Sequence, residues 1–184
     1  MAVTTPGAEL GRPAIPFSLP STTGNTVTLD SARGPKGLLI VFMCNHCPYV
    51  KAIIDRLIRD AKDLQAEGIN TVAISSNDVD TYPEDSFDKM KAWAEEKNFP
   101  FPYLFDESQE VAKAYGAVCT PDFFGYNADL ELQYRGRLDE SKKDTAPEDA
   151  ERELYEGMKE IAEIGRTTIR QIPSMGCSIK WKAA

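Results

Sequence analysis

The sequence predicts a single α/β domain with a central mixed β-sheet flanked by helices. Apolar runs of strand length alternate with longer segments whose apolar residues recur every three or four positions. Strands that alternate with helices pair in parallel. Residues 123–126 and 130–135 form two further apolar runs around a short polar turn, which predicts an antiparallel hairpin. The length of 184 residues fits one such domain, over 1–184.

Each expected element has a local signal in the chain. The first 36 residues are rich in Pro, Gly, Ser and Thr and predict two short strands. The continuous apolar run 38–43 predicts a strand buried on both faces. The expected elements are strands at 17–19, 26–29, 38–43, 69–76 and 103–105, a helix over 50–64 ending before Gly68, a helix opened by the capping box Thr81-x-x-Glu84, a short helix from Asp106 to Gly116, the hairpin, and a last helix capped by Thr145-x-Pro147-Glu148.

Composition excludes several classes of protein. The net charge of −8 argues against nucleic acid as a partner, because phosphate binding needs clustered Lys and Arg. The longest apolar run is far shorter than the roughly 20 residues that span a bilayer, and residues 1–10 lack the features of a signal peptide. We therefore expect no membrane association and a cytoplasmic location. Four cysteines are too few for a disulfide scaffold, and one histidine excludes sites built on two.

The segment Cys44-Asn45-His46-Cys47 is a Cys-x-x-Cys motif between the buried strand and the long helix. This position would place Cys44 near the N-cap of the helix, where free backbone N–H groups stabilise a thiolate. Pro48 fits the first helical turn, where its missing N–H costs nothing. His46 can add a positive charge or a donor beside the thiolate. The motif therefore predicts thiol–disulfide chemistry.

These residues, together with others, resemble a known family. Phe17-Ser-Leu-Pro, Gly24-Asn25-x-Val27-x-Leu29 and the strand into Cys44-x-x-Cys47 are similar to the thioredoxin-like superfamily, in the redoxin branch that includes peroxiredoxins and TlpA/ResA-type thiol–disulfide proteins. Cys119-Thr120-Pro121 resembles the cis-proline loop of that fold. With the tail Ser174-Met-Gly-Cys-Ser-Ile-Lys-Trp181, the resemblance spans about residues 8–181 and points to peroxiredoxin-like redoxins that carry a CxxC motif.

The resemblance implies a thioredoxin-like fold with an N-terminal β extension, a core over about residues 8–165 and a C-terminal tail over 166–184. It also implies that Pro121 is cis and packs against the cysteine pair. Thr120 would then offer its backbone to an extended substrate, in the manner of an added strand.

We interpret the chain as a thiol–disulfide oxidoreductase. Cys44 is the expected attacking thiolate, Cys47 the resolving cysteine, and His46 the group that tunes the potential, with Asn45 and Pro48 in supporting positions. No cofactor is expected. The expected partners are a protein or small-molecule disulfide or thiol and an electron-donor thiol protein, and the oligomeric state is left open.

Three alternatives stay open. A peroxiredoxin-like thiol peroxidase would use Cys47-Pro48, but Cys44 then replaces the family's peroxide-orienting threonine and Ile40 its proline. A redox sensor would cycle only its own disulfide. A soft-metal protein would use Cys44, His46, Cys47 and Cys119, although no second CxxC completes a tetrahedral site, and we expect no metal.

Four further residues fit either a structural or a chemical role. Cys119, two residues before Pro121, and Cys177, in the tail, are candidates for additional redox chemistry, but each also fits as a packed small hydrophobe. Asn77 and Asp78 follow the second buried strand at the sheet edge where α/β proteins place ligand contacts. They fit either a proton relay or a turn.

Overall fold

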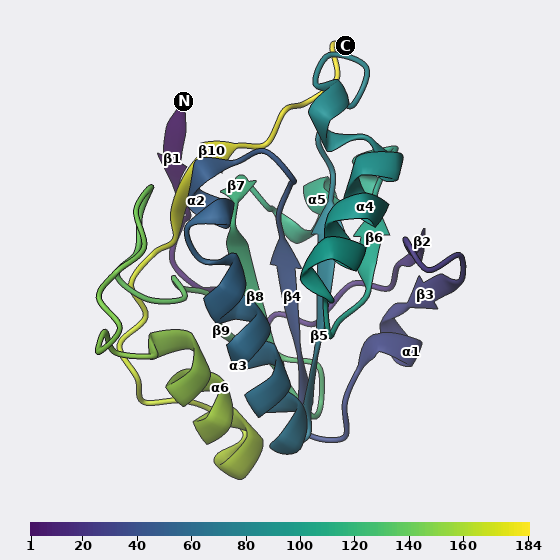
Figure 1. Ribbon diagram of the computed structural model, residues 1–184. Coiled ribbons are helices and arrows are strands. Elements are labelled where there is room, and N and C mark those ends of the chain that lie inside the picture. The colour runs from purple at the N-terminus through teal and green to yellow at the C-terminus, as the bar shows by residue number, and fades with distance from the viewer.

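The apolar run at 38–43 becomes the central strand of the sheet. A computed structural model describes residues 1–184 and places β4 (Gly37–Phe42) in the middle of five strands, with order β6-β5-β4-β8-β9 (Figure 1). β4 is parallel to β5 (Ile69–Ser75) and antiparallel to β8 (Asp122–Asn127). β6 (Tyr103–Phe105) and β9 (Leu132–Tyr134) form the edges. The predicted mixed sheet and hairpin are confirmed.

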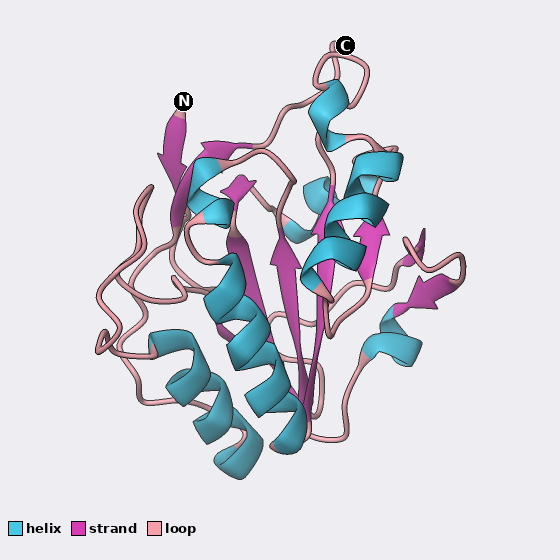
Figure 2. Cartoon of the chain, viewed as in Figure 1, coloured by secondary structure: helices cyan, strands magenta, loops and turns pink.

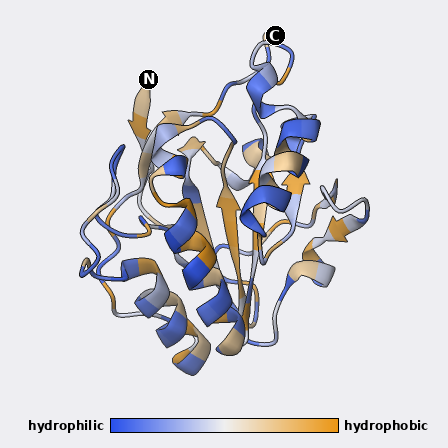
Figure 3. Cartoon of the chain, in the orientation of Figure 1, coloured by the Kyte–Doolittle hydropathy of each residue, from blue (hydrophilic) through white to orange (hydrophobic).

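Both faces of β4 are buried, because its alternate side chains enter two separate apolar clusters. Leu39 and Val41 pack with the helices of one face, whereas Leu38 and Ile40 pack on the other. All four side chains have no exposed area. Figure 3 shows the consequence: the strand is hydrophobic along its length, and the helices turn their polar sides outward.

Helices cover the sheet on both sides (Figure 2). α3 (Ile54–Ala66), α4 (Phe87–Lys97) and α6 (Glu153–Ile164) contribute to one apolar cluster. The opposite cluster is closed by α1 (Leu29–Ala32), α5 (Glu110–Tyr115) and the pair β2 (Ser18–Pro20) and β3 (Thr26–Thr28). None of the helices combines the length and the apolar content needed to cross a bilayer.

A second, three-stranded sheet lies beside the carboxyl end of β4. Its order is β1-β10-β7, with β1 (Ala2–Thr4), β10 (Met175–Ser178) and β7 (Cys119–Thr120). The short helix α2 (Pro48–Lys51) packs against β10, and Figure 1 shows these elements side by side near the N-terminus. The sequence predicted neither β1 nor β10, since both are short and lack alternating apolar residues.

Two predicted helix starts are wrong. The capping box Thr81-x-x-Glu84 does not form: Thr81 donates to Asp78, η1 (Pro83–Asp85) is a 3₁₀ turn, and α4 is capped by Ser86. The last helix begins at Glu153 rather than at Pro147, because the Thr145 hydroxyl instead donates to the carbonyl of Ala52. In both cases another hydrogen bond, local for Thr81 and tertiary for Thr145, engages the side chain that the sequence predicted as a cap.

Candidate active site

The cysteine motif turns the chain from β4 into α2. Cys47, and not Cys44, is the N-cap of α2, so the expected position of the cap is three residues off. Pro48 is the first helical residue, as predicted, and the amides of Val50 and Lys51 donate to the Cys47 carbonyl. Both thiols are reduced in this structure and buried, with 1% of Cys44 and 0% of Cys47 exposed.

Thr120 contacts both sulfurs. The peptide bond between Thr120 and Pro121 is cis, as the resemblance implies. The hydroxyl of Thr120 lies 3.5 Å from Cys44 Sγ, and its carbonyl oxygen accepts from the Cys47 thiol at 3.2 Å. The cysteine motif and the cis-proline loop, which are more than seventy residues apart in sequence, therefore form one site.

Asp85 holds the loop that carries the motif. Its carboxylate is fully buried, and its Oδ1 accepts from the backbone N–H groups of Asn45 at 2.9 Å and His46 at 3.3 Å. Its Oδ2 accepts from Asn77 Nδ2 at 2.9 Å. Asn45 adds two links, from its Nδ2 to the Glu84 carbonyl and from the Tyr103 hydroxyl to its Oδ1. A buried carboxylate is stable only with such partners, so these bonds fix the loop.

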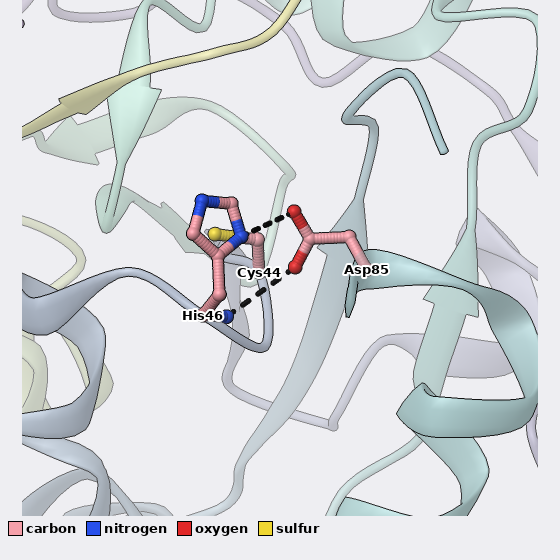
Figure 4. A group of neighbouring side chains, drawn as sticks. All are labelled: Cys44, His46 and Asp85. Carbon is pink, nitrogen blue, oxygen red and sulfur yellow. Dashed lines mark hydrogen bonds and ion pairs between the residues drawn. The ribbon is translucent and has the colours of Figure 1, made fainter. Parts of the chain in front are cut away.

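The imidazole ring of His46 lies next to the Asp85 carboxylate. Its Nδ1 lies 2.6 Å from Asp85 Oδ2, and Figure 4 shows this nitrogen directed at the carboxylate, with the sulfur of Cys44 overlapping the ring in this view. The ligand-type atoms of Cys44, His46 and Asp85 lie within 4.8 Å of one another. The ring is parallel to Tyr82, with centroids 6.1 Å apart. The arrangement offers a nitrogen base, oriented by a carboxylate, next to a thiol.

The pKa values of the two thiols are shifted in opposite directions. Interaction with the Cys44 thiol, then with Thr120 and Cys177, lowers the pKa of Cys47 from its ordinary 9.0 to about 4. The same interaction with Cys47, then burial and the Asp85 carboxylate, raises the pKa of Cys44 well above its usual range. The two thiols are thus coupled: the contact between them favours ionisation of Cys47 and disfavours ionisation of Cys44.

The other two cysteines differ from each other. Cys119 is fully buried, its thiol donates to the Pro121 carbonyl at 3.6 Å, and burial raises its pKa. Cys177 is partly exposed on β10, and its thiol interacts with Cys47. Burial and this neighbour raise the pKa of Cys177 to about 11. Cys119 is thus a packed residue of β7, whereas Cys177 lies on β10 opposite Thr120.

The backbone edge of Thr120, expected to be free for a substrate, is occupied in the structure. β10 pairs with β7 there, and Cys177 is the register partner of Thr120. A cavity of about 290 Å³ adjoins the cis-proline, lined among others by Tyr49, Pro121 and Phe123, but neither Cys44 nor Cys47 lines it. A substrate in this cavity would touch the proline loop without reaching a sulfur.

Sequence reasoning missed Asp85, which it assigned to the start of a helix. The available signal was topological: the carboxyl ends of parallel strands meet at one edge, so the loop after β5 had to approach the loop after β4. Asn77 was noted on that ground, and it does contact Asp85. The metal alternative also changes, because the carboxylate and not Cys47 or Cys119 lies with Cys44 and His46.

Comparisons with known proteins agree with this architecture. The model of the AhpC/TSA family matches residues 10–140. An uncharacterized conserved protein from Geobacillus kaustophilus is 45% identical, with a TM-score of 0.94 over 100% of this chain and 98% of its own. A hypothetical protein from Sinorhizobium meliloti 1021 is 36% identical, with a TM-score of 0.93 over 98% and 99%. The thioredoxin domain of a thiol-disulfide oxidoreductase from Bacteroides vulgatus is 16% identical, with a TM-score of 0.63 over 85% and 99%, which shows the thioredoxin-like fold.

The lowered pKa of Cys47 predicts that this residue titrates at acid pH. Ultraviolet thiolate absorbance of the reduced protein should fall with a midpoint near pH 4, and Cys47→Ser should remove this step while Cys119→Ser keeps it. Because the folded pKa is depressed below 9.0, the thiolate's contribution to the free energy of unfolding is complete above pH 9 and is lost as the pH falls to about 4. A thiolate signal that appears only above pH 8 would contradict the assignment.

Proposed function

Because the chain belongs to the AhpC/TSA family and has a thioredoxin-like fold, we propose that it catalyses thiol–disulfide exchange at Cys44 and Cys47. The observation that carries the proposal is the meeting of both thiols at Thr120, beside a cis-proline and at the end of a buried strand. The chemistry needs only these side chains. Its partners would be a protein or small-molecule disulfide and a thiol protein that donates electrons.

Within the pair, we assign the first attack to Cys47. Its pKa of about 4 makes it a thiolate at neutral pH, and the thiolate is the attacking species. Its sulfur also contacts the carbonyl oxygen of Thr120, the residue with which β10 pairs. Cys44 keeps its proton and would resolve the mixed disulfide by attacking Cys47. This order reverses the roles that the motif alone suggested.

His46 would serve the resolving step. Cys44 must lose its proton before it attacks, and the Asp85 carboxylate disfavours the thiolate form of Cys44. An imidazole within reach of that thiol, oriented by Asp85, can take up the proton as Cys44 attacks. Asp85 acts here as a positioning residue.

Thiol peroxidase is a second candidate, favoured by the same Cys47 thiolate and by the family. Cys47-Pro48 at the start of α2 matches the cysteine and proline of the peroxiredoxin motif. Cys44, however, stands where that motif has a threonine. The hydroxyl that would polarise a peroxide is thus replaced by a thiol.

Trapping experiments test the order of attack. In Cys44→Ser/Cys177→Ser, Cys47 should form a mixed disulfide with a disulfide substrate that persists, because no neighbouring thiol remains to resolve it. In Cys47→Ser/Cys177→Ser no comparable adduct should form. Mass spectrometry of the intact chain measures both. An adduct found only in the second variant would restore Cys44 as the attacking residue.

A rate comparison separates the two candidate activities. We expect the wild-type protein to reduce a protein disulfide, with dithiothreitol as the electron source, much faster than it reduces hydrogen peroxide at equal concentration. Cys47→Ser should abolish both reactions, and Cys119→Ser should leave both unchanged. A faster reaction with peroxide would make the protein a peroxidase instead.

Substitution at His46 tests the proton transfer. His46→Gln should slow resolution, so that the mixed disulfide on Cys47 persists longer, and should flatten the dependence of that step on pH. Asp85→Asn should slow it as well, since the ring loses its orienting carboxylate. Glu95→Gln, on the exposed side of α4, is the matched control. Resolution at the wild-type rate in His46→Gln, followed by stopped-flow quenching, would remove His46 from the mechanism.

A further inference from the structure

The tail strand β10 occupies the position of an added substrate strand. It pairs antiparallel with β7, with Cys177 opposite Thr120 and Ser178 opposite Cys119. Ser174 Oγ donates to the Pro121 carbonyl at 2.7 Å, and the Ile179 N–H donates to the Val118 carbonyl. β1 pairs with its other edge. β10 is therefore an integral strand, and it runs along the backbone that would bind an extended disulfide substrate.

Gly176 permits this close approach. A Cβ at residue 176 would lie 1.9 Å from the Thr120 carbonyl oxygen and 2.5 Å from its carbonyl carbon, both backbone atoms. Real side chains do not reach such distances, so any residue but glycine would push β10 away from the cis-proline loop. The glycine thus lets the next residue, Cys177, pair with Thr120, whose carbonyl oxygen accepts from the Cys47 thiol.

Cys177 is also the only cysteine that solvent reaches. Cys44, Cys47 and Cys119 are at most 1% exposed, whereas Cys177 is partly exposed. Thr120 brings the three residues together, since its hydroxyl contacts Cys44, its carbonyl oxygen accepts from the Cys47 thiol, and Cys177 is its register partner on β10. An electron donor that approaches the closed protein therefore meets Cys177 first.

We propose that Cys177 is a third redox residue, which carries the active-site disulfide from the buried pair to the surface. The proposal rests on the redox role of Cys44 and Cys47. The Cys177 thiolate attacks Cys47 Sγ of the Cys44–Cys47 disulfide, the Cys47–Cys177 bond forms, and Cys44 leaves as a thiolate. Cys177 gives up one proton and Cys44 takes up one, so neither electrons nor protons are gained overall. A dithiol protein or small thiol then reduces the exposed disulfide.

The charges around Cys177 suit this sequence of events. The negative charge of Cys47 is one of the effects that raise the pKa of Cys177, while Lys180 and the N-terminal amine lower it. When Cys47 enters a disulfide its charge disappears and the two cations remain. The Cys177 thiolate therefore forms more easily in the oxidised protein, which is the state in which it has to attack.

A variant that lacks Cys44 tests the proposed bond directly. Oxidised glutathione added to reduced Cys44→Ser should produce a Cys47–Cys177 disulfide, with two glutathione thiols released per chain, identified by peptide mapping. Cys44→Ser/Cys119→Ser should give the same bond. Cys44→Ser/Cys177→Ser should instead hold one glutathione on Cys47. A Cys44→Ser chain that holds glutathione on Cys47 while Cys177 stays free would overturn the proposal.

The rate of disulfide turnover distinguishes a redox role of Cys177, called here a relay, from a role of β10 in covering the site. If Cys177 is a relay, Cys177→Ser and Gly176→Val should both lose turnover of a disulfide substrate with a protein dithiol as reductant. Circular dichroism confirms that the variants are folded. If Cys177→Ser is unchanged and Gly176→Val is faster, β10 only covers the site and the relay is refuted. A wild-type protein that forms the Cys47–Cys177 bond yet turns over no disulfide would leave this bond standing and refute the proposed function instead.

Discussion

Contact with Thr120 is the constraint on which the rest of the site depends. Its hydroxyl meets Cys44, its carbonyl oxygen meets Cys47, and its backbone pairs with Cys177. One residue thus contacts both sulfurs of the motif and pairs with the strand that carries the third cysteine. The same carbonyl oxygen lies where a side chain at residue 176 would have to go, so the approach of the tail strand and the placement of the thiols have a common origin.

A buried carboxylate is the second determinant. Asp85 is fully buried and takes its partners from the cysteine loop, from Asn77 and from His46. Isolated burial of such a charge would be strongly unfavourable, and the hydrogen bonds compensate it. The charge also has an electrostatic effect on Cys44, because it disfavours the thiolate form of that residue.

Sequence reasoning succeeded where the determinants are local. Periodicity located β4 and α3, and the Cys-x-x-Cys motif and Thr120-Pro121 indicated the two loops that meet. It failed where distant segments decide. β10 has four residues, and its partner β7 is more than fifty residues away, so nothing near Cys177 indicates a strand. Asp85 resembles any acidic residue of a first turn until the fold brings its loop to His46. The N-cap of the helix was predicted near Cys44. The residues of the motif instead form the turn between β4 and α2, so the N-cap is Cys47.

The neighbouring positions of Cys44, Cys47 and Cys177 around Thr120 have a consequence for the proposed chemistry. One sulfur can belong to only one disulfide at a time, so the proposed reactions give two oxidised isomers, Cys44–Cys47 and Cys47–Cys177, that contain the same number of electrons. Their ratio is independent of the ambient potential. It depends instead on the relative free energies of the two disulfides and of the thiol that each leaves free, to which the conformation of β10 contributes. A molecule that binds or moves that strand would therefore change which sulfur is left free without changing how oxidised the protein is.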